Sequence, residues 1–261
     1  MTELLNRFRK DNISRLAELG ERLDTRKVND FRELKVRTNI NSQAEGSAEV
    51  FLGKTRVIVG VKLQLGVPYP DSPNEGTISV TAEMSPIASP DFEMGPPREP
   101  AIELARVVDR GIRESKTIDL EKLCVKEKAK VWTVFIDMWV LDYDGNLIDA
   151  CGIAALAALK TAKMPLLKEE KDEFVKTGEF APLPIRDLPI PCTVAKIGKF
   201  LLVDPNADED MAMDARITIT TNSKGNICSI QKGEGGFFTE DEIMAAAQMS
   251  LDRGKQVRPL L

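Results

Sequence analysis

Residues 139–159, WVLDYDGNLIDACGIAALAAL, follow the order of elements that builds a phosphate-binding site. An apolar run ends in an acidic turn containing Gly145, and small apolar residues typical of a helix follow. The first N–H groups of a helix lack partners within the helix, and its dipole favours an anion beside them. The helix begins, however, with Asn146, Leu147 and Ile148, so no Arg, Lys, Ser or Thr is present to hold phosphate. The segment has the shape of a phosphate site without its side chains.

Three arginines lie at helical spacing between residues 99 and 115. Arg106, Arg110 and Arg113 occupy positions i, i+4 and i+7, which places them within about 60° of one another on a helix. Such a stripe can bind the phosphates of a polyanion. It can also be a solvated face with salt bridges, because Glu103 and Asp109 lie near it. The spacing by itself favours the solvated face.

A dense acidic segment, VDPNADEDMAMDAR, covers residues 203–216. Asp208, Asp210 and Asp214 can bind a divalent ion or supply a general acid. The segment lacks the Gly and the terminal Glu of a calcium loop, so an exposed acidic loop is the simpler interpretation. Residues 232–236, KGEGG, lack the Lys-Ser/Thr of a phosphate-binding P-loop, and we expect a tight turn there.

The composition excludes several kinds of chemistry. The chain has no histidine, which removes the Ser-His-Asp and Cys-His mechanisms and most catalytic zinc sites. A net charge of −5 argues against a generally basic nucleic-acid binder but permits a local basic stripe. The 4 cysteines form no CxxC pair, so we expect reduced thiols and neither a metal nor another cofactor. No apolar run is long enough for a membrane span, and the charged N-terminus, MTELLNRFRKDN, lacks the apolar segment of a signal peptide, so we expect a cytoplasmic protein.

Hydrophobic periodicity indicates the elements of an N-terminal half. Residues 3–19 resemble an amphipathic helix, and the period then changes to two, as in strands. A nearly continuous apolar strand is expected to be covered on both faces. The elements expected are strands at 48–52, 57–65, 77–84 and 131–141, a loop at 86–100, and helices at 99–115 and 150–162.

The same pattern of strands followed by a helix recurs near the C-terminus. Thr239 and Glu242 form the capping box of a final helix. A proline-containing, charged segment separates the two halves. Together the halves predict an α+β protein without regular βα alternation. The elements expected in this half are strands at 192–195, 200–203, 216–221 and 227–231 and the helix that begins at 239.

Several of these segments, taken in order, resemble the RNase PH family. They are GERLDTRKVNDFRELKV, EGSAEVFLGKTRVIVGVKLQ, IELARVVDRGIRES, VLDYDGNLIDACGIAALAAL, VDPNADEDMAMDARITIT and IQKGEGGFFTEDEI. The segment PYPDSPNEGTISVTAEMSPIASPDFEMGPP most resembles the non-catalytic RNase PH-like subunit of the archaeal exosome core. The resemblance implies an RNase PH fold of two halves with βαβ-like topology, similar to domain 2 of ribosomal protein S5. We assign residues 1–167 to the N-terminal half with its leading helix, 168–190 to a connection, and 191–261 to the C-terminal half.

The resemblance also implies a function. Active family members shorten RNA from its 3′ end by phosphorolysis, using inorganic phosphate and releasing nucleoside diphosphates. In the exosome, active and inactive subunits form heterodimers, three of which close into a hexameric ring around a channel, and RNA-binding cap proteins lie on one face. We therefore expect an active RNase PH-like subunit, cap proteins and RNA as partners, and no membrane.

The positions that do chemistry in active members are altered in this chain. Their Gly-Thr-Arg at the helix start corresponds to Asn146, Leu147 and Ile148, so the phosphate site is degenerate. Their Arg pair corresponds to Arg98 followed by Glu99.

Active members also carry two Asp six residues apart. Asp208 and Asp214 reproduce this spacing, and we interpret them as a vestigial catalytic pair. The resemblance further favours RNA binding by Arg106 and Arg110, with Arg113 and Arg98 beside them. Two alternatives stay open: an active exoribonuclease with a divergent phosphate site, and an unrelated small-molecule enzyme or binding module on a similar fold.

Overall fold

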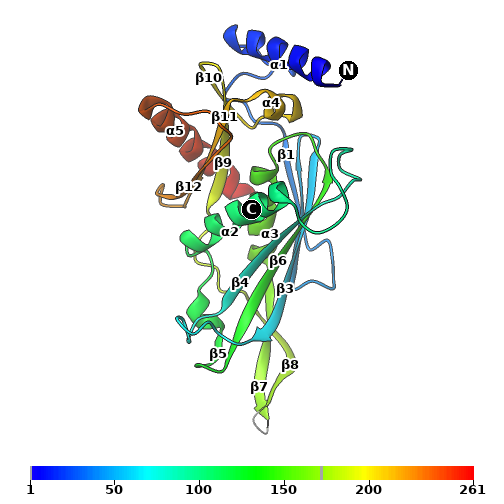
Figure 1. Ribbon diagram of the computed structural model, residues 1–261. Coiled ribbons are helices and arrows are strands. Elements are labelled where there is room, and N and C mark those ends of the chain that lie inside the picture. The colour runs from blue at the N-terminus through cyan, green and yellow to red at the C-terminus, as the bar shows by residue number, and fades with distance from the viewer. Residues whose placement is uncertain (1, 171–172) are drawn as a thin grey trace.

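The computed structural model describes residues 2–170 and 173–261 and has the α+β architecture that the sequence predicts (Figure 1). Within the described residues, the N-terminal half holds a six-stranded sheet in the order β1-β2-β3-β6-β4, with β5 paired to β6. The pairs are antiparallel except that β4 runs parallel to β6, with α2 in the crossover between them. The elements of this half are β1 Leu34–Thr38, β2 Gly46–Leu52, β3 Thr55–Gly66, β4 Thr77–Met84, α2 Glu99–Glu114, η1 Leu120–Leu123, β5 Cys124–Lys126, β6 Lys130–Asp142 and α3 Leu147–Thr161.

The C-terminal half is a four-stranded antiparallel sheet in the order β10-β9-β11-β12. The final helix, α5, packs on β9 and β11 and begins with the predicted capping box between Thr239 and Glu242. The elements of this half are β9 Ile190–Ile197, β10 Phe200–Val203, α4 Ala207–Ala212, β11 Ala215–Thr221, β12 Ile227–Gly233, α5 Glu240–Val257 and η2 Arg258–Leu260.

A β-hairpin crosses the boundary at residue 167 that the sequence suggested. It consists of β7, Lys163–Glu170, and β8, Glu173–Pro182, which pair with each other and project from the body of the molecule (Figure 1). The connection between the halves is therefore a ribbon followed by the extended chain that enters β9. Apolar-polar alternation is weak in this charged segment, which is why the sequence did not indicate strands.

The leading helix α1, Thr2–Glu18, was assigned to the N-terminal half but packs on the C-terminal half. Ile13 and Ala17 are buried against Ile197 and Leu202 of the second sheet and against Ala212 of α4. Sequence periodicity indicates which face of a helix is buried but not which element covers it. The chain thus starts on the C-terminal half, continues through the N-terminal half, and then forms the rest of the C-terminal half.

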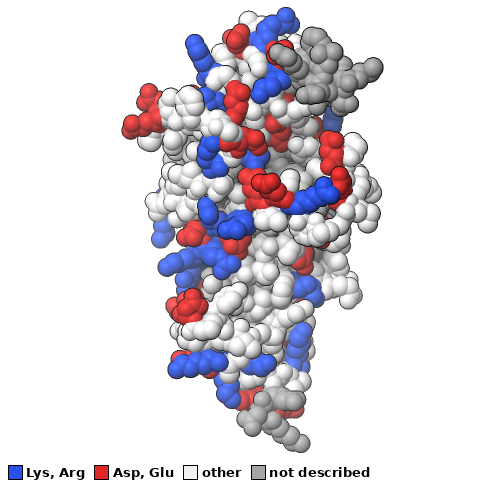
Figure 2. All heavy atoms as spheres, in the orientation of Figure 1, with Lys and Arg blue, Asp and Glu red and all other residues white. Residues whose placement is uncertain are grey.

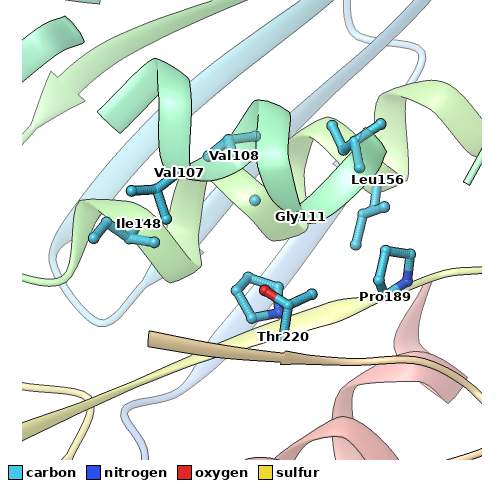
Figure 3. Close-up of a pocket in the computed structure, with 10 residues that line it drawn as sticks. Val107, Val108, Gly111, Ile148, Leu156, Pro189 and Thr220 are labelled. Carbon is cyan, nitrogen blue, oxygen red and sulfur yellow. The ribbon is translucent and has the colours of Figure 1, made fainter. Parts of the chain in front are cut away.

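Helix α3 is the centre of the core. All twelve residues from Ile148 to Leu159 are buried, and the helix packs on β2 and β3 of the first sheet and on β9 of the second. Its small side chains permit close contact: a Cβ at Gly46 of β2 would lie 2.3 Å from the carbonyl oxygen of Ala158. A cavity of about 20 Å³ remains between α2, α3 and β11 (Figure 3). The Ala-rich run at 150–162 therefore forms the layer between the two sheets.

The expectation that residues 131–141 are covered on both faces is wrong. Burial along β6 alternates, and Trp139 on the outer face is 49% exposed. Both α2 and α3 pack on the inner face, since they contact each other as well as the first sheet. Large apolar side chains on the outer face made the run look continuous.

Cys151 and Cys192 are buried, Cys124 and Cys228 are half-buried, and all are free thiols. Within the described ranges, no helix has the length and apolar character that a membrane crossing requires.

Candidate functional site

The start of α3 lies where the two halves meet. Asn146 is the N-cap residue in a left-handed conformation, with φ of 52°, and its backbone N–H donates to Asp210 Oδ2 at 3.0 Å. Gly145 precedes it with φ of 84°, and a Cβ there would lie 2.5 Å from the carbonyl oxygen of Pro205. The turn therefore needs glycine so that the acidic segment can approach the helix. The anion beside this helix end is the chain's own Asp210 carboxylate.

A cavity of about 260 Å³ opens beside this helix end. Three of its lining residues are acidic: Glu103 of α2, Asp210 of α4 and Glu234 after β12. Arg216 of β11 is the one cationic side chain among the described lining residues, and it pairs with Glu103 at 2.6 Å and Glu234 at 3.6 Å. Carboxylates thus outnumber the guanidinium, and a phosphate dianion would be repelled.

Asp210, which accepts the backbone N–H of this helix end, is half-buried. Burial raises the pKa of Asp210 to about 6, although the Asn146 N–H and the Arg216 guanidinium lower it. Tyr143 also donates its hydroxyl to Asp210 at 3.2 Å. Near neutral pH this carboxyl is mainly ionised, which adds to the repulsion of an anion.

The three residues of the degenerate phosphate site are buried or half-buried at the start of α3. Asn146 is buried, Leu147 is half-buried against the cavity, and Ile148 is buried in the core. Neither aliphatic side chain can donate a hydrogen bond to phosphate. The structure places these residues at the predicted position, the N-terminus of α3, and fills their surroundings with acidic groups.

A buried ionic network, which sequence reasoning did not find, joins this helix end to the N-terminal segment. Asp204 is fully buried and accepts from Arg32 at 2.7 and 2.9 Å, from Arg26 at 3.1 Å and from the Asn146 side chain at 2.8 Å. Burial alone raises the pKa of Asp204, but the Arg32 guanidinium and Asn146 outweigh it and hold that pKa below its ordinary value. The neighbouring Arg22 and Glu209 form a second buried pair, at 2.5 and 2.7 Å.

The acidic segment is therefore not the exposed loop that its composition suggests. Asp208 lies half-buried in the short helix α4 and does not line the cavity. Asp214 is exposed after that helix, where it accepts from the Gly198 N–H at 2.8 Å and lies 3.5 Å from Lys10. The structure does not bring this pair to the start of α3, and it brings Asp204 and Asp210 there instead. The two pairs have the same six-residue spacing, so spacing did not distinguish them.

The arginines of α2 are exposed on one face, as their spacing predicts. Figure 2 shows Lys and Arg side chains gathered over α2. Arg106 and Arg110 line a depression of about 350 Å³, and Arg110 donates to Gln231 of β12 at 2.8 Å. Arg113 is instead held by Asp109, at 2.7 and 3.1 Å, and by the carbonyl of Ile78 at 3.2 Å. Two of the three arginines thus remain available to a ligand.

Arg98 precedes α2 on an exposed loop and forms an ion pair with Glu93. It does not line the depression that Arg106 and Arg110 share. The structure therefore does not group Arg98 with the stripe of α2.

Comparison with known proteins now identifies the class. The 3′ exoribonuclease family model matches with its domain 1 over residues 30–165 and with its domain 2 over residues 187–253. The chain belongs to this family, the RNase PH family, and the resemblance seen in the sequence is confirmed.

Relatives with a narrower description match over the full length. The exosome complex component Rrp42 of Thermococcus onnurineus is 50% identical over 258 residues, which cover 98% of this chain and 95% of the relative. The protein of that name from Methanosarcina mazei is 48% identical and covers 100% of this chain and 96% of the relative.

Solved structures agree on the fold. A chain of the Archaeoglobus fulgidus exosome with RNA bound to the active site has a TM-score of 0.91 and 44% identity, covering 98% of each chain. Rice Rrp46, at 17% identity and a TM-score of 0.69, shares the fold alone. The RNase PH fold expected from the sequence is confirmed.

Proposed function

We propose that this chain is a non-catalytic structural subunit of an exosome ring. It pairs with an active RNase PH-like subunit, supports phosphorolytic degradation and processing of RNA in the 3′-to-5′ direction, and helps to bind RNA in the channel. Full-length relatives named as exosome components support this assignment.

One observation carries the non-catalytic part: the cavity at the start of α3 is acidic. Phosphorolysis needs inorganic phosphate as the nucleophile, and here phosphate would meet Glu103, Asp210 and Glu234. Arg216, which lines the same cavity, is already paired with two of these carboxylates. Losing the charge-assisted hydrogen bonds of an arginine costs about 1.5–3 kcal/mol for each bond, and Leu147 and Ile148 supply none in return.

The RNA-binding part rests on α2. Arg106 and Arg110 are exposed, lie one helical turn apart, and can each meet a phosphate of a single strand without reading bases. Gln231 accepts from Arg110 across the junction of the two halves and thereby fixes where that guanidinium points. We keep Arg113 and Arg98 as weaker candidates, because each already has an acidic partner.

The assembly follows the same proposal. The chain forms heterodimers with the active subunit, three heterodimers close into a hexameric ring, and RNA-binding cap proteins complete the complex in the cytoplasm. Solved exosome cores that resemble this chain over nearly its whole length support a multi-subunit setting.

The test is to co-express the chain with its active paralogue and to compare phosphorolysis with and without it. We expect the complex, but not the chain alone, to shorten RNA and release nucleoside diphosphates in a phosphate-dependent way. Light scattering on the eluting complex measures the stoichiometry of the ring. Phosphate-dependent release by the purified chain alone would refute the non-catalytic assignment.

The alternative, an active enzyme with a divergent phosphate site, is favoured by one observation. Asp210 lies in the cavity with its pKa raised to about 6 by burial, which suits a general acid. This alternative predicts that Asp210→Asn abolishes activity even when the catalytic residues of the partner subunit are intact. Unchanged activity in that variant and in Asp214→Asn removes it.

A further inference from the structure

The outer face of the first sheet carries a row of directly paired residues that runs across five strands. The register joins Arg37 of β1, Glu49 of β2, Ile58 of β3, Trp139 of β6 and Glu83 of β4. Paired residues on neighbouring strands share a face, and the strands lie about 4.8 Å apart. The two helices that pack on this sheet, α2 and α3, lie on its inner face.

At the β2 end of this row, an aromatic ring and a carboxylate both have arginine partners within the chain. Phe51, beside Glu49 on β2, lies beneath two guanidinium groups, those of Arg37 and Arg56, at 5.3 and 5.4 Å from its ring. The same arginines pair with Glu49 at 3.5 and 2.7 Å. An aromatic ring and a carboxylate on this face therefore share guanidinium partners.

At the β4 end of the row, Trp139 and Glu83 again place an aromatic ring beside a carboxylate, but no arginine in the described part of the chain accompanies them. Trp139 is 49% exposed and is paired in register with Glu83, which is also exposed. Among the residues that the structure describes, none forms an ion pair with Glu83 or places a cation over Trp139. This end repeats the chemistry of the Phe51 end and lacks its arginine.

A groove of about 750 Å³ begins at this position, between the end of β4 and the loop that leads to α2. It offers apolar surface, including Met94 at 87% exposure, and a surplus of carboxylates. Arg98 also lines it but is neutralised by Glu93. The acidic residues that line the groove are Glu83, Asp91, Glu93 and Glu99.

The groove also includes an open sheet edge. β4 is the last strand in the sheet order and pairs with β6 alone among the described strands. The carbonyl of Ile78 faces away from β6, because it accepts from Arg113 at 3.2 Å. Backbone groups alternate in direction along a strand, so Ala82 and Met84, which line the groove, present theirs to the same open side. An extended chain can add there as a further strand.

We propose that this groove binds an arginine-bearing, extended segment of another protein chain. Its guanidinium stacks on Trp139 and pairs with Glu83, and its backbone adds to the open edge of β4. The carboxylates select a basic segment and repel the phosphates of nucleic acid. This proposal goes beyond the RNA-guiding role and does not depend on it.

The test uses a fluorescein-labelled peptide, Val-Arg-Val-Arg-Val with both ends blocked, and the full chain. Fluorescence anisotropy gives its affinity, and emission of Trp139 reports contact at the groove, since Trp132 is 3% exposed. The matched peptide carries citrulline, which keeps the shape of arginine without the charge. We expect the citrulline peptide to bind about tenfold more weakly.

The variant Glu83→Gln completes the test. It should lower the affinity of the arginine peptide about tenfold and leave the citrulline peptide nearly unchanged. Glu127→Gln, at an exposed turn on the same half, is the control and should change neither. The proposal is overturned if the arginine peptide does not saturate, if both peptides bind equally, or if Glu83→Gln has no effect. Quenching of Trp139 by oligoadenylate in place of the peptide would assign the groove to nucleic acid and overturn it as well.

Discussion

The start of α3 and the exposed face of α2 both carry charged side chains. They differ in whether those side chains are buried and paired within the chain. At the start of α3, the fully buried Asp204 is bound by Arg26, Arg32 and Asn146. On α2, Arg106 is exposed, and the described residues give it no ion pair. Charges whose partners lie inside the chain hold the two halves together, whereas charges left on the surface remain available to another molecule.

The largest effect is expected at Asp204. Asp204→Asn removes the charge nearest to Arg32 and leaves this buried guanidinium with only the more distant carboxylate of Asp144, at 3.5 Å. Breaking one side of a buried ion pair costs about 3–5 kcal/mol. We expect a loss of this size in the free energy of unfolding, measured by urea denaturation with unchanged slope.

The matched control for this change is Asp142→Asn. Asp142 is exposed at the end of β6, so the free energy of unfolding should change by less than about 0.5 kcal/mol. Equal effects of the two variants would contradict the view that the buried network joins the halves.

The second effect is a pH dependence at the same helix end. Burial raises the pKa of Asp149 to about 6 from 3.8, although Asn146 and Thr193 donate hydrogen bonds to it. Between these pH values the folded chain holds a proton that the unfolded chain has lost, so stability falls as pH rises from about 4 to 6. The contribution is on the order of 2–3 kcal/mol. Asp149→Asn should reduce this fall in stability without abolishing it, because burial also raises the pKa of Asp210 to about 6, and an unchanged profile would refute the assignment.

The third effect concerns the other side of the comparison. In the reconstituted complex, replacing both Arg106 and Arg110 by Ala should weaken RNA binding by about tenfold at low salt and lower the salt slope by about 1.4. Arg113→Ala is the matched control, because Asp109 already neutralises that arginine. Filter binding across a salt series measures both. Equal losses in the control would show that α2 acts through its total charge and not through its unpaired arginines.

Local elements of this fold could be predicted because their signals are local. The strand at 77–84 was predicted with the bounds the structure has, and the helix at 99–115 ends within one residue of α2. The capping box at Thr239 has a fixed spacing within one turn. Periodicity and caps act over a few residues, so one sequence is sufficient to find them.

The contacts that define the site are not local. Asp204 meets Arg32, which is 172 residues away, and no spacing rule connects them. Asp204 and Asp210 reach α3 because both accept hydrogen bonds from Asn146, whereas Asp214 is exposed and lies elsewhere. The resemblance to the family located Asn146, Leu147 and Ile148, while the acidic lining of the cavity became visible only in three dimensions, because Glu103 and Glu234 come from different halves.

The smallest effect is expected at Gly111, which lines the small cavity between α2 and α3 together with Gly152 (Figure 3). A Cβ at Gly111 would lie 3.4 Å from Thr220 Oγ1, an ordinary contact, whereas a Cβ at Gly152 would lie 2.7 Å from Pro191 Cγ. Gly111→Ala should stabilise the chain by about 0.5–1 kcal/mol, since alanine favours the helix and fills the space. Gly152→Ala should destabilise it by about 1–3 kcal/mol, because the proline ring must move. Thermal melts compare the two variants.

RNA binding by Gly111→Ala should be unchanged, because the cavity lies on the buried side of α2 and Arg106 lies on the exposed side. Weaker RNA binding in that variant would mean that the two faces of α2 are coupled. The separation between structural charge and available charge would then not hold for this helix.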